Sequence, residues 1–167
     1  MENGIIHCRV DDRLIHGIVA GLWTNFLKAT RLMVIDDKAS QDQMVRDSLR
    51  MAAPAAVALS VLNTDKAIAN IKNGNYADGQ RVLVIAKSPV IYAKLAEAGI
   101  EIPDVHMGNI TYTEDRIKVA KTVSCNAEEI EALEKLAAKG TKIISRLMPS
   151  DSPEDFMEML HKAQKAE

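Results

Sequence analysis

The densest polar run in this sequence lies near its start and reads Arg9-Val10-Asp11-Asp12-Arg13-Leu14-Ile15-His16-Gly17. It follows a segment typical of a β-strand and precedes one typical of a helix. Backbone N–H groups at the start of a helix have no partner within the helix, and with the helix dipole they favour a bound anion. The position of this run therefore predicts a phosphate site.

The side chains of the run suit a phosphoryl group. Arg13 can bind two phosphate oxygens through parallel hydrogen bonds. A neutral imidazole is a competent nucleophile, and the ordinary pKa of histidine, about 6.5, leaves His16 largely neutral in the cytosol. We expect Asp11 or Asp12 to orient one of these two groups. Gly17 lacks a side chain that would crowd the backbone near a phosphate. A solvated loop with internal Asp–Arg pairs is the competing interpretation.

Other phosphate and metal chemistries have less support. Paired acids after the first strand, with Lys87 after the fourth, also occur in receiver domains, but Asn63-Thr64 stands where such a domain needs a phosphorylatable aspartate. Neither cysteine begins a Cys-x5-Arg phosphatase loop, and neither GxGxxG nor GxxxxGK[ST] is present. No two histidines have metal-ligand spacing. We therefore expect no metal and no cofactor.

The other three histidines fit other roles. His7 lies inside the first expected strand, which favours a structural role. His106 lies close to the expected rim of the sheet, but we favour a structural role over a place in the site. His161 lies on the last expected helix and should be exposed.

Composition limits the class of protein. The 167 residues include 21 Lys and Arg against 23 Asp and Glu, so no basic excess suggests nucleic acid. No apolar run reaches the roughly 18–20 residues of a membrane helix, and the start lacks the pattern of a signal peptide. Two cysteines give no disulfide framework. We expect a cytoplasmic protein with a single domain over residues 1–167.

Short β-branched runs alternate with longer amphipathic runs along the chain. This predicts a three-layer α/β fold, with a mainly parallel central sheet flanked by helices and an antiparallel strand at its edge. The expected strands are 5–10, 31–35, 57–62, 81–86, 105–109, 117–123 (a candidate edge strand) and 142–147. The expected helices are 15–27, 41–53, 65–72, 88–98, 126–139 and one from residue 152 onward. Ligand sites in such sheets form beyond the carboxyl ends of the strands. These ends are 10–17, 36–40, 63, 87–88 and 107–112.

Several segments resemble the B subunits of the mannose–fructose–sorbose class of the bacterial sugar phosphotransferase system. The run RVDDRLIHGIV is similar to the family signature RxDDRLIHGQV. LMVIDDKASQDQMVRDSLRMAAP, VHMGNI, KVAKTVSCNAEEIEALEKLAAKG and RLMPSD also resemble family segments. The resemblance covers residues 4–152.

The resemblance implies a phosphocarrier, a protein-histidine–sugar phosphotransferase with a phosphohistidine intermediate. His16 would take the phosphoryl group at Nδ1 from a phosphohistidine of a IIA subunit or domain, and Arg13 would bind its oxygens. Asp11 and Asp12 match the family's acidic pair. The group would pass to a sugar imported by membrane IIC and IID subunits, which places the chain at the cytoplasmic side of the permease complex. The sequence does not specify which sugar is carried, and it is compatible with a homodimer.

The sequence departs from the family pattern at Ile18 and at residues 20–22, next to the motif, and in the glycine loop at residues 108–109. Ile18 replaces the usual glutamine, so a side-chain hydrogen bond is lost although its backbone N–H remains. Asn109 stands where a second glycine is common. We expect Leu14, Ile18 and Trp23 to supply apolar docking residues, with a core position favoured for Trp23. The alternative function is a regulatory or binding module of the same fold that no longer delivers phosphate to sugar.

Overall fold

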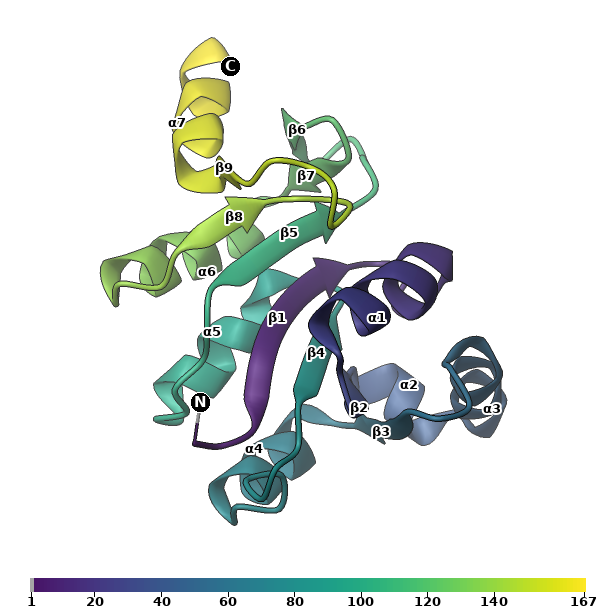
Figure 1. Ribbon diagram of the computed structural model, residues 1–167. Coiled ribbons are helices and arrows are strands. Elements are labelled where there is room, and N and C mark those ends of the chain that lie inside the picture. Colours follow the sequence, from purple (N-terminus) through teal and green to yellow (C-terminus); the bar gives the residue numbers. More distant parts are fainter. Residues whose placement is uncertain (1) are drawn as a thin grey trace.

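The computed structural model describes residues 2–167 and has a central sheet between two layers of helices (Figure 1). The strands are β1 (Ile5–Asp11), β2 (Arg31–Ile35), β3 (Ala58–Leu62), β4 (Val82–Ala86), β5 (Val105–Asn109), β6 (Ile117–Ala120), β7 (Val123–Cys125), β8 (Ile143–Ser145) and β9 (Glu154–Asp155). The helices are η1, a π-helix (Ile18–Trp23), α1 (Thr24–Leu27), α2 (Asp37–Gln41), α3 (Gln43–Ala52), α4 (Thr64–Lys72), α5 (Pro89–Glu97), α6 (Ala127–Ala138) and α7 (Phe156–Ala166).

The main sheet has the strand order β3-β2-β4-β1-β5-β8-β9. All of its pairings are parallel except β8 with β9, which is antiparallel. The predicted α/β class with an antiparallel edge strand is therefore confirmed. The edge strand is β9, however, and not segment 117–123, which forms β6 and pairs with β7 in a separate two-stranded sheet.

Both faces of the main sheet are buried. Along β4, Val82, Val84 and Ala86 face one core, while Leu83 and Ile85 face the other, as expected for alternating side chains. The first core contains side chains of α4, α5, α6 and α7, and the second those of η1, α2 and α3. Figure 1 shows α5 and α6 behind the sheet and α1 in front of it.

The last helix, α7, begins at Phe156 with Asp155 as its cap, and not at residue 152 as expected, because residues 154–155 pair with β8 as β9. Two other helices begin at clear capping residues. Ser88 caps α5 with Pro89 in its first turn, and Asn126 and Glu129 form a capping box at the start of α6. The short helix α2 was not predicted; its cap is Asp36, whose carboxylate accepts from the Ala39 N–H at 2.9 Å. Within residues 2–167, none of the helices has the length and apolar character required to span a bilayer.

Candidate functional site

The loop between β1 and η1 turns sharply at the carboxyl end of a central strand. Leu14 has a φ of 59°, which side chains other than glycine rarely adopt, and its N–H donates to the carbonyl of Asp11 at 3.0 Å. The side chains of Leu14 and Ile15 are buried in the core beside η1. These two anchors leave Arg13 and His16 at the surface of the same short loop.

Asp11, the last residue of β1, joins these two surface side chains. Its carboxylate is fully buried, and Oδ1 accepts from the Arg13 N–H at 3.0 Å and from Arg13 Nε at 3.1 Å. Its other oxygen, Oδ2, accepts from Arg13 Nη2 at 3.1 Å and lies 2.8 Å from His16 Nε2. One buried carboxylate therefore fixes both the arginine and the histidine.

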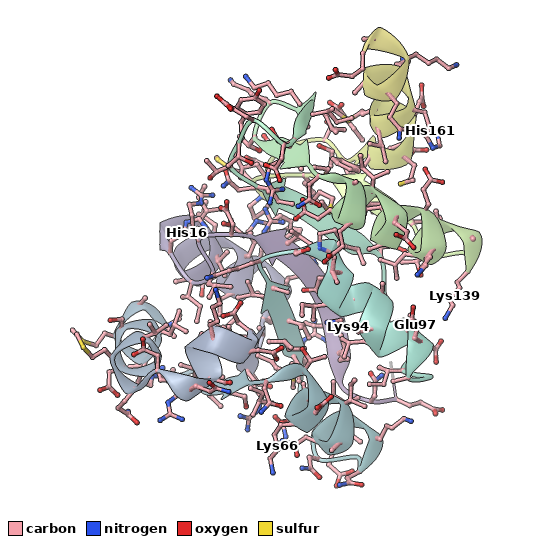
Figure 2. The ribbon with its side chains drawn as sticks, turned by 180° about the vertical axis from the view of Figure 1, so that it is seen from behind. His16, Lys66, Lys94, Glu97, Lys139 and His161 are labelled. Carbon is pink, nitrogen blue, oxygen red and sulfur yellow. The ribbon has the colours of Figure 1, made fainter. Side chains whose placement is uncertain are left out.

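This contact decides which ring nitrogen of His16 faces outward. An ionised carboxylate is an acceptor only, so Nε2 carries the proton and Nδ1 keeps its lone pair. The side chain is 20% exposed, and that of Arg13 is 42% exposed. Figure 2 shows His16 beside the first helical segment, at one edge of the molecule. The arrangement turns Nδ1 of His16 away from Asp11 at the protein surface, beside the guanidinium of Arg13.

The start of the first helix supplies backbone donors next to His16. Gly17 precedes η1, and the first i+4 bond runs from Ala20 N to the carbonyl of His16 at 2.8 Å. The N–H groups of residues 17–19 precede this bond and belong to the first turn, whose N–H groups have no acceptor within the helix. A Cβ at Gly17 would meet no protein atom within 4 Å, so packing does not require glycine there. The side chain of Ile18 is partly buried against the core.

Asp12 has a different role from Asp11. Its carboxylate accepts from Asn109 Nδ2 and from the Thr111 N–H, both at 2.8 Å, and its own N–H donates to the Asn109 carbonyl at 3.0 Å. Burial favours the neutral carboxyl, but these hydrogen bonds outweigh it and hold the pKa of Asp12 below its ordinary value. Asp12 therefore ties the loop to the end of β5, while Asp11 contacts His16.

Comparison with known proteins places the chain in a family. The model of the sorbose-subfamily IIB component of the phosphotransferase system (PTS) matches residues 5–167. The chain belongs to this IIB family. It is 32% identical over 161 residues to the fructose-specific EIIB component of Bacillus subtilis (strain 168), covering 96% of this chain and 98% of that protein. It is also 32% identical to the mannose-specific EIIAB component of Escherichia coli (strain K12), covering 94% of this chain and 48% of that protein.

Solved structures of IIB components have the same fold. The IIBSor domain of the sorbose permease from Klebsiella pneumoniae superimposes with a TM-score of 0.89 at 28% identity, covering 95% of this chain and 96% of that domain. The N-acetylgalactosamine IIB component from Streptococcus pyogenes gives 0.86 at 25% identity, with 93% and 96% coverage. The mainly parallel sheet is therefore shared with the IIB family.

Other rim positions of this IIB chain serve mainly as helix caps. Asn63 accepts from the Lys66 N–H at 2.7 Å at the start of α4, and Ser88 accepts from the Val90 N–H at 3.2 Å at the start of α5. Because their side chains are used for capping, these predicted ligand positions add nothing visible to the His16 site. Among residues 2–167, no group of three or more metal-ligating side chains is placed to hold an ion.

Behind the loop of the IIB chain lies a buried cluster of rings and cations that sequence reasoning did not assign to the site. The rings of His7 and His106 are 4.2 Å apart, and His7 lies 4.9 Å from Trp23. Burial is the main cause that lowers the pKa of His106 to about 4 and that of His7 well below its ordinary value. His7 and His106 therefore stay neutral at pH 7. Arg9 lies over the Trp23 ring at 4.4 Å. The one feature of the sequence that pointed to this cluster was the charged Arg9 inside an apolar strand.

Proposed function

We propose that this chain is the phosphocarrier of a sugar PTS, with residues 1–167 acting as one IIB domain. His16 accepts a phosphoryl group from a phosphohistidine of a IIA partner and passes it to a sugar imported by membrane IIC and IID subunits. The observation that carries this proposal is the buried Asp11 carboxylate, which binds His16 through Nε2 and so leaves Nδ1 available.

The chemistry is two successive in-line transfers. In the first, the Nδ1 lone pair of His16 attacks phosphorus, the N–P bond of the donor histidine breaks, and its electron pair stays on the donor ring. In the second, a sugar hydroxyl attacks, the bond from phosphorus to Nδ1 breaks, and the hydroxyl proton leaves to a base at the permease. Such transfers depend on positioning and charge stabilisation. Arg13 and the helix N-terminus supply both to the phosphoryl oxygens.

Asp11 acts on the imidazole through both steps. When phosphorus is bound to Nδ1 and the proton remains on Nε2, the ring carries a positive charge. The carboxylate at 2.8 Å stabilises that charge and holds the ring in one orientation. Because the Nε2 proton stays in place, the ring needs no rotation between acceptance and donation.

Docking of the IIA partner needs an exposed surface around His16. Leu14, which the sequence suggested as a docking residue, does not fit because it is buried, and Trp23 is buried in the core, the position that the sequence favoured. Leu22 and Phe26 lie on the same helical segment and are 44% and 55% exposed. We assign the IIA docking surface to Ile18, Leu22 and Phe26, beside the cationic Arg13. This role places the chain at the cytoplasmic face of the permease.

Phosphoryl uptake in vitro tests the function. The purified chain is mixed with phosphoenolpyruvate, the general PTS proteins and a IIA subunit known to be active, and its mass is followed. We expect an acid-labile gain of one phosphoryl group that is absent from His16→Ala. The matched control is His161→Ala, since His161 is also exposed but lies on α7, apart from His16 (Figure 2). No gain in the unmodified chain would contradict the carrier function and favour the regulatory alternative.

A further inference from the structure

Arg9 is a buried cation whose hydrogen-bond partners include no carboxylate. Its side chain is 0% exposed on the face of β1 that also carries Asp11. Nη2 donates to the carbonyl oxygens of Arg146, at 2.9 Å, and Leu147. Nε and Nη1 have no hydrogen-bond partner among residues 2–167. A fully buried charge is destabilising unless something compensates it.

The compensating charge is Asp11. Burial lowers the pKa of Arg9 to about 10, and Asp11 is the strongest of the groups that act in the opposite direction. Side chains two residues apart on a strand share a face at roughly 6–7 Å, so Arg9 and Asp11 attract each other without a direct hydrogen bond. The other ionisable groups near Arg9 are the cations Arg13 and Arg146 and the neutral His7, Tyr92 and His106. Asp11 is the one carboxylate among these neighbours.

Phosphoryl transfer makes conflicting demands on Arg13. All three recorded hydrogen bonds of Arg13 go to Asp11. A phosphoryl group on His16 needs the same guanidinium. If Arg13 turns to the phosphoryl oxygens, Asp11 loses its side-chain donors from Arg13 while it stays fully buried. A carboxylate left in that position would be destabilised, or would hold Arg13 back, unless a second cation remained nearby.

We propose that Arg9 is a positioning residue, the permanent countercharge of Asp11 that lets Arg13 move from this carboxylate to the phosphoryl group on His16. Arg9 is suited to the task because its guanidinium cannot leave. Nη2 is held by two backbone carbonyls, and Trp23, which stacks on the guanidinium, donates through Nε1 to the Leu147 carbonyl at 2.8 Å. This inference rests on the carrier function proposed above.

The first test compares Arg9→Met with Arg9→Lys in phosphoryl uptake as a function of pH. Removing the cation makes the His16 ring easier to protonate and strengthens the hold of Asp11 on Arg13. For Arg9→Met we therefore expect uptake at pH 7 to fall roughly tenfold or more, and the pH of half-maximal uptake to rise by about one pH unit. Arg9→Lys keeps the charge and should keep the pH profile. A folded Arg9→Met chain with an unchanged profile would overturn the proposal.

Arg31→Met is the matched control for the loss of an arginine. Arg31 also lies near an aromatic ring, 5.4 Å from that of Tyr76, and donates to Gln80 and Ser60 and to no carboxylate. We expect a lower melting temperature and an unchanged pH profile. A change in the profile of this variant equal to that of Arg9→Met would remove the case for a specific role of Arg9.

The second test measures the pairing of Arg9 and Asp11 without phosphoryl transfer. Melting temperatures are measured for Arg9→Met, Asp11→Asn and the double variant. We expect Arg9→Met to lower the melting temperature less in the Asp11→Asn background than in the unmodified chain. Equal losses in both backgrounds would overturn the inference. If Arg9→Met does not fold alone, folding of the double variant supports the pairing and its failure to fold contradicts it. Absence of phosphoryl uptake by the unmodified chain would instead refute the carrier function.

Discussion

At the scale of single residues, two adjacent acids have different environments. Asp11 is the last residue of β1, points into the molecule and receives Arg13 and His16. Asp12 follows it, points to the other side and binds the loop after β5. Because side chains alternate along a strand, one residue of offset separates the orienting acid from the structural one.

Asp11→Asn tests the orienting role. Asparagine keeps the size of the side chain but offers an NH2 group in place of one oxygen and no charge, so the His16 ring is no longer held with Nε2 protonated. We expect phosphoryl uptake to fall roughly 100-fold, and 15N NMR to show a mixture of the two imidazole tautomers.

Asp12→Asn is the control for that variant. It weakens the tie to Asn109 and Thr111, so the melting temperature should fall. The tautomer of His16 should not change, because Asp12 has no recorded hydrogen bond to the ring. A larger loss of uptake from Asp12→Asn than from Asp11→Asn would reverse the two roles.

Gly108→Ala tests the space that Arg9 occupies. A Cβ at this position would lie 2.6 Å from Arg9 Nη2 and 3.1 Å from the Val10 carbonyl oxygen, so the guanidinium would have to shift. We expect a lower melting temperature and slower uptake. Gly21→Ala is the control, since a Cβ there meets nothing within 4 Å, and thermal melts of the two variants should differ clearly. Equal melting temperatures would contradict the close packing at Gly108.

At the scale of elements, the pairing of β1 and β5 carries a pH-sensitive contact. The rings of His7 and His106 are in contact, with their planes tilted by 31°, and burial is the main cause that lowers the pKa of both. Well above pH of about 6.5 both are neutral in the folded and the unfolded chain, and at about 6.5 the unfolded chain begins to take up protons on them. As pH falls from there toward 4, the unfolded chain takes up protons that the folded chain resists, so stability falls. We expect the melting temperature to decrease across this window.

Replacing one member of the histidine pair tests the origin of this pH dependence. His106→Asn should flatten the dependence between pH 6.5 and 4, because one of the two groups with a lowered pKa is gone. His161→Ala should leave it in place, since His161 is about half exposed and pairs with Glu134 at the surface. An unchanged slope in His106→Asn would show that other groups cause the acid destabilisation.

The helical segment formed by η1 and α1 exposes two apolar side chains, Leu22 and Phe26. If Leu22 and Phe26 contact the IIA partner, Phe26→Ser should raise the KM for phosphorylated IIA roughly tenfold and leave kcat nearly unchanged. Met51→Ser on α3 is the control, because Met51 is exposed but lies on another helix. Equal KM values for Phe26→Ser and the unmodified chain, in steady-state uptake, would move the docking surface elsewhere.

At the scale of the whole molecule, local signals predicted the layers but not the short elements. The sequence indicates the strands β1, β2 and β4 by their β-branched runs, and it indicates the helix caps at Ser88 and Asn126. These features can be predicted because each depends on neighbouring residues alone. β9 has two residues and exists only through its pairing with β8. The π-helical form of η1 is likewise not encoded by a local pattern. Such elements depend on tertiary contacts, which a periodicity argument does not contain.

The residues of the candidate site likewise fall into those that the sequence predicts and those that only the structure shows. His16, Arg13 and the helix start were predicted from residue types within one run. The choice between Asp11 and Asp12 needed the exact end of β1, and Arg9 needed the strand pairing that buries it against Gly108 and Trp23. Residues that act on the site from another element, or from the interior of the sheet, could therefore be identified only in the structure.

The most direct test of the account is the identity of the phosphorylated nitrogen. The chain labelled with 15N in its histidines is phosphorylated through IIA, and the phosphorus–nitrogen coupling is measured by NMR at neutral pH. We expect phosphorus on Nδ1 of His16, with Nε2 still protonated and bonded to Asp11. Phosphorus on Nε2, or on any other residue, would contradict the central claim that Asp11 selects the nucleophile.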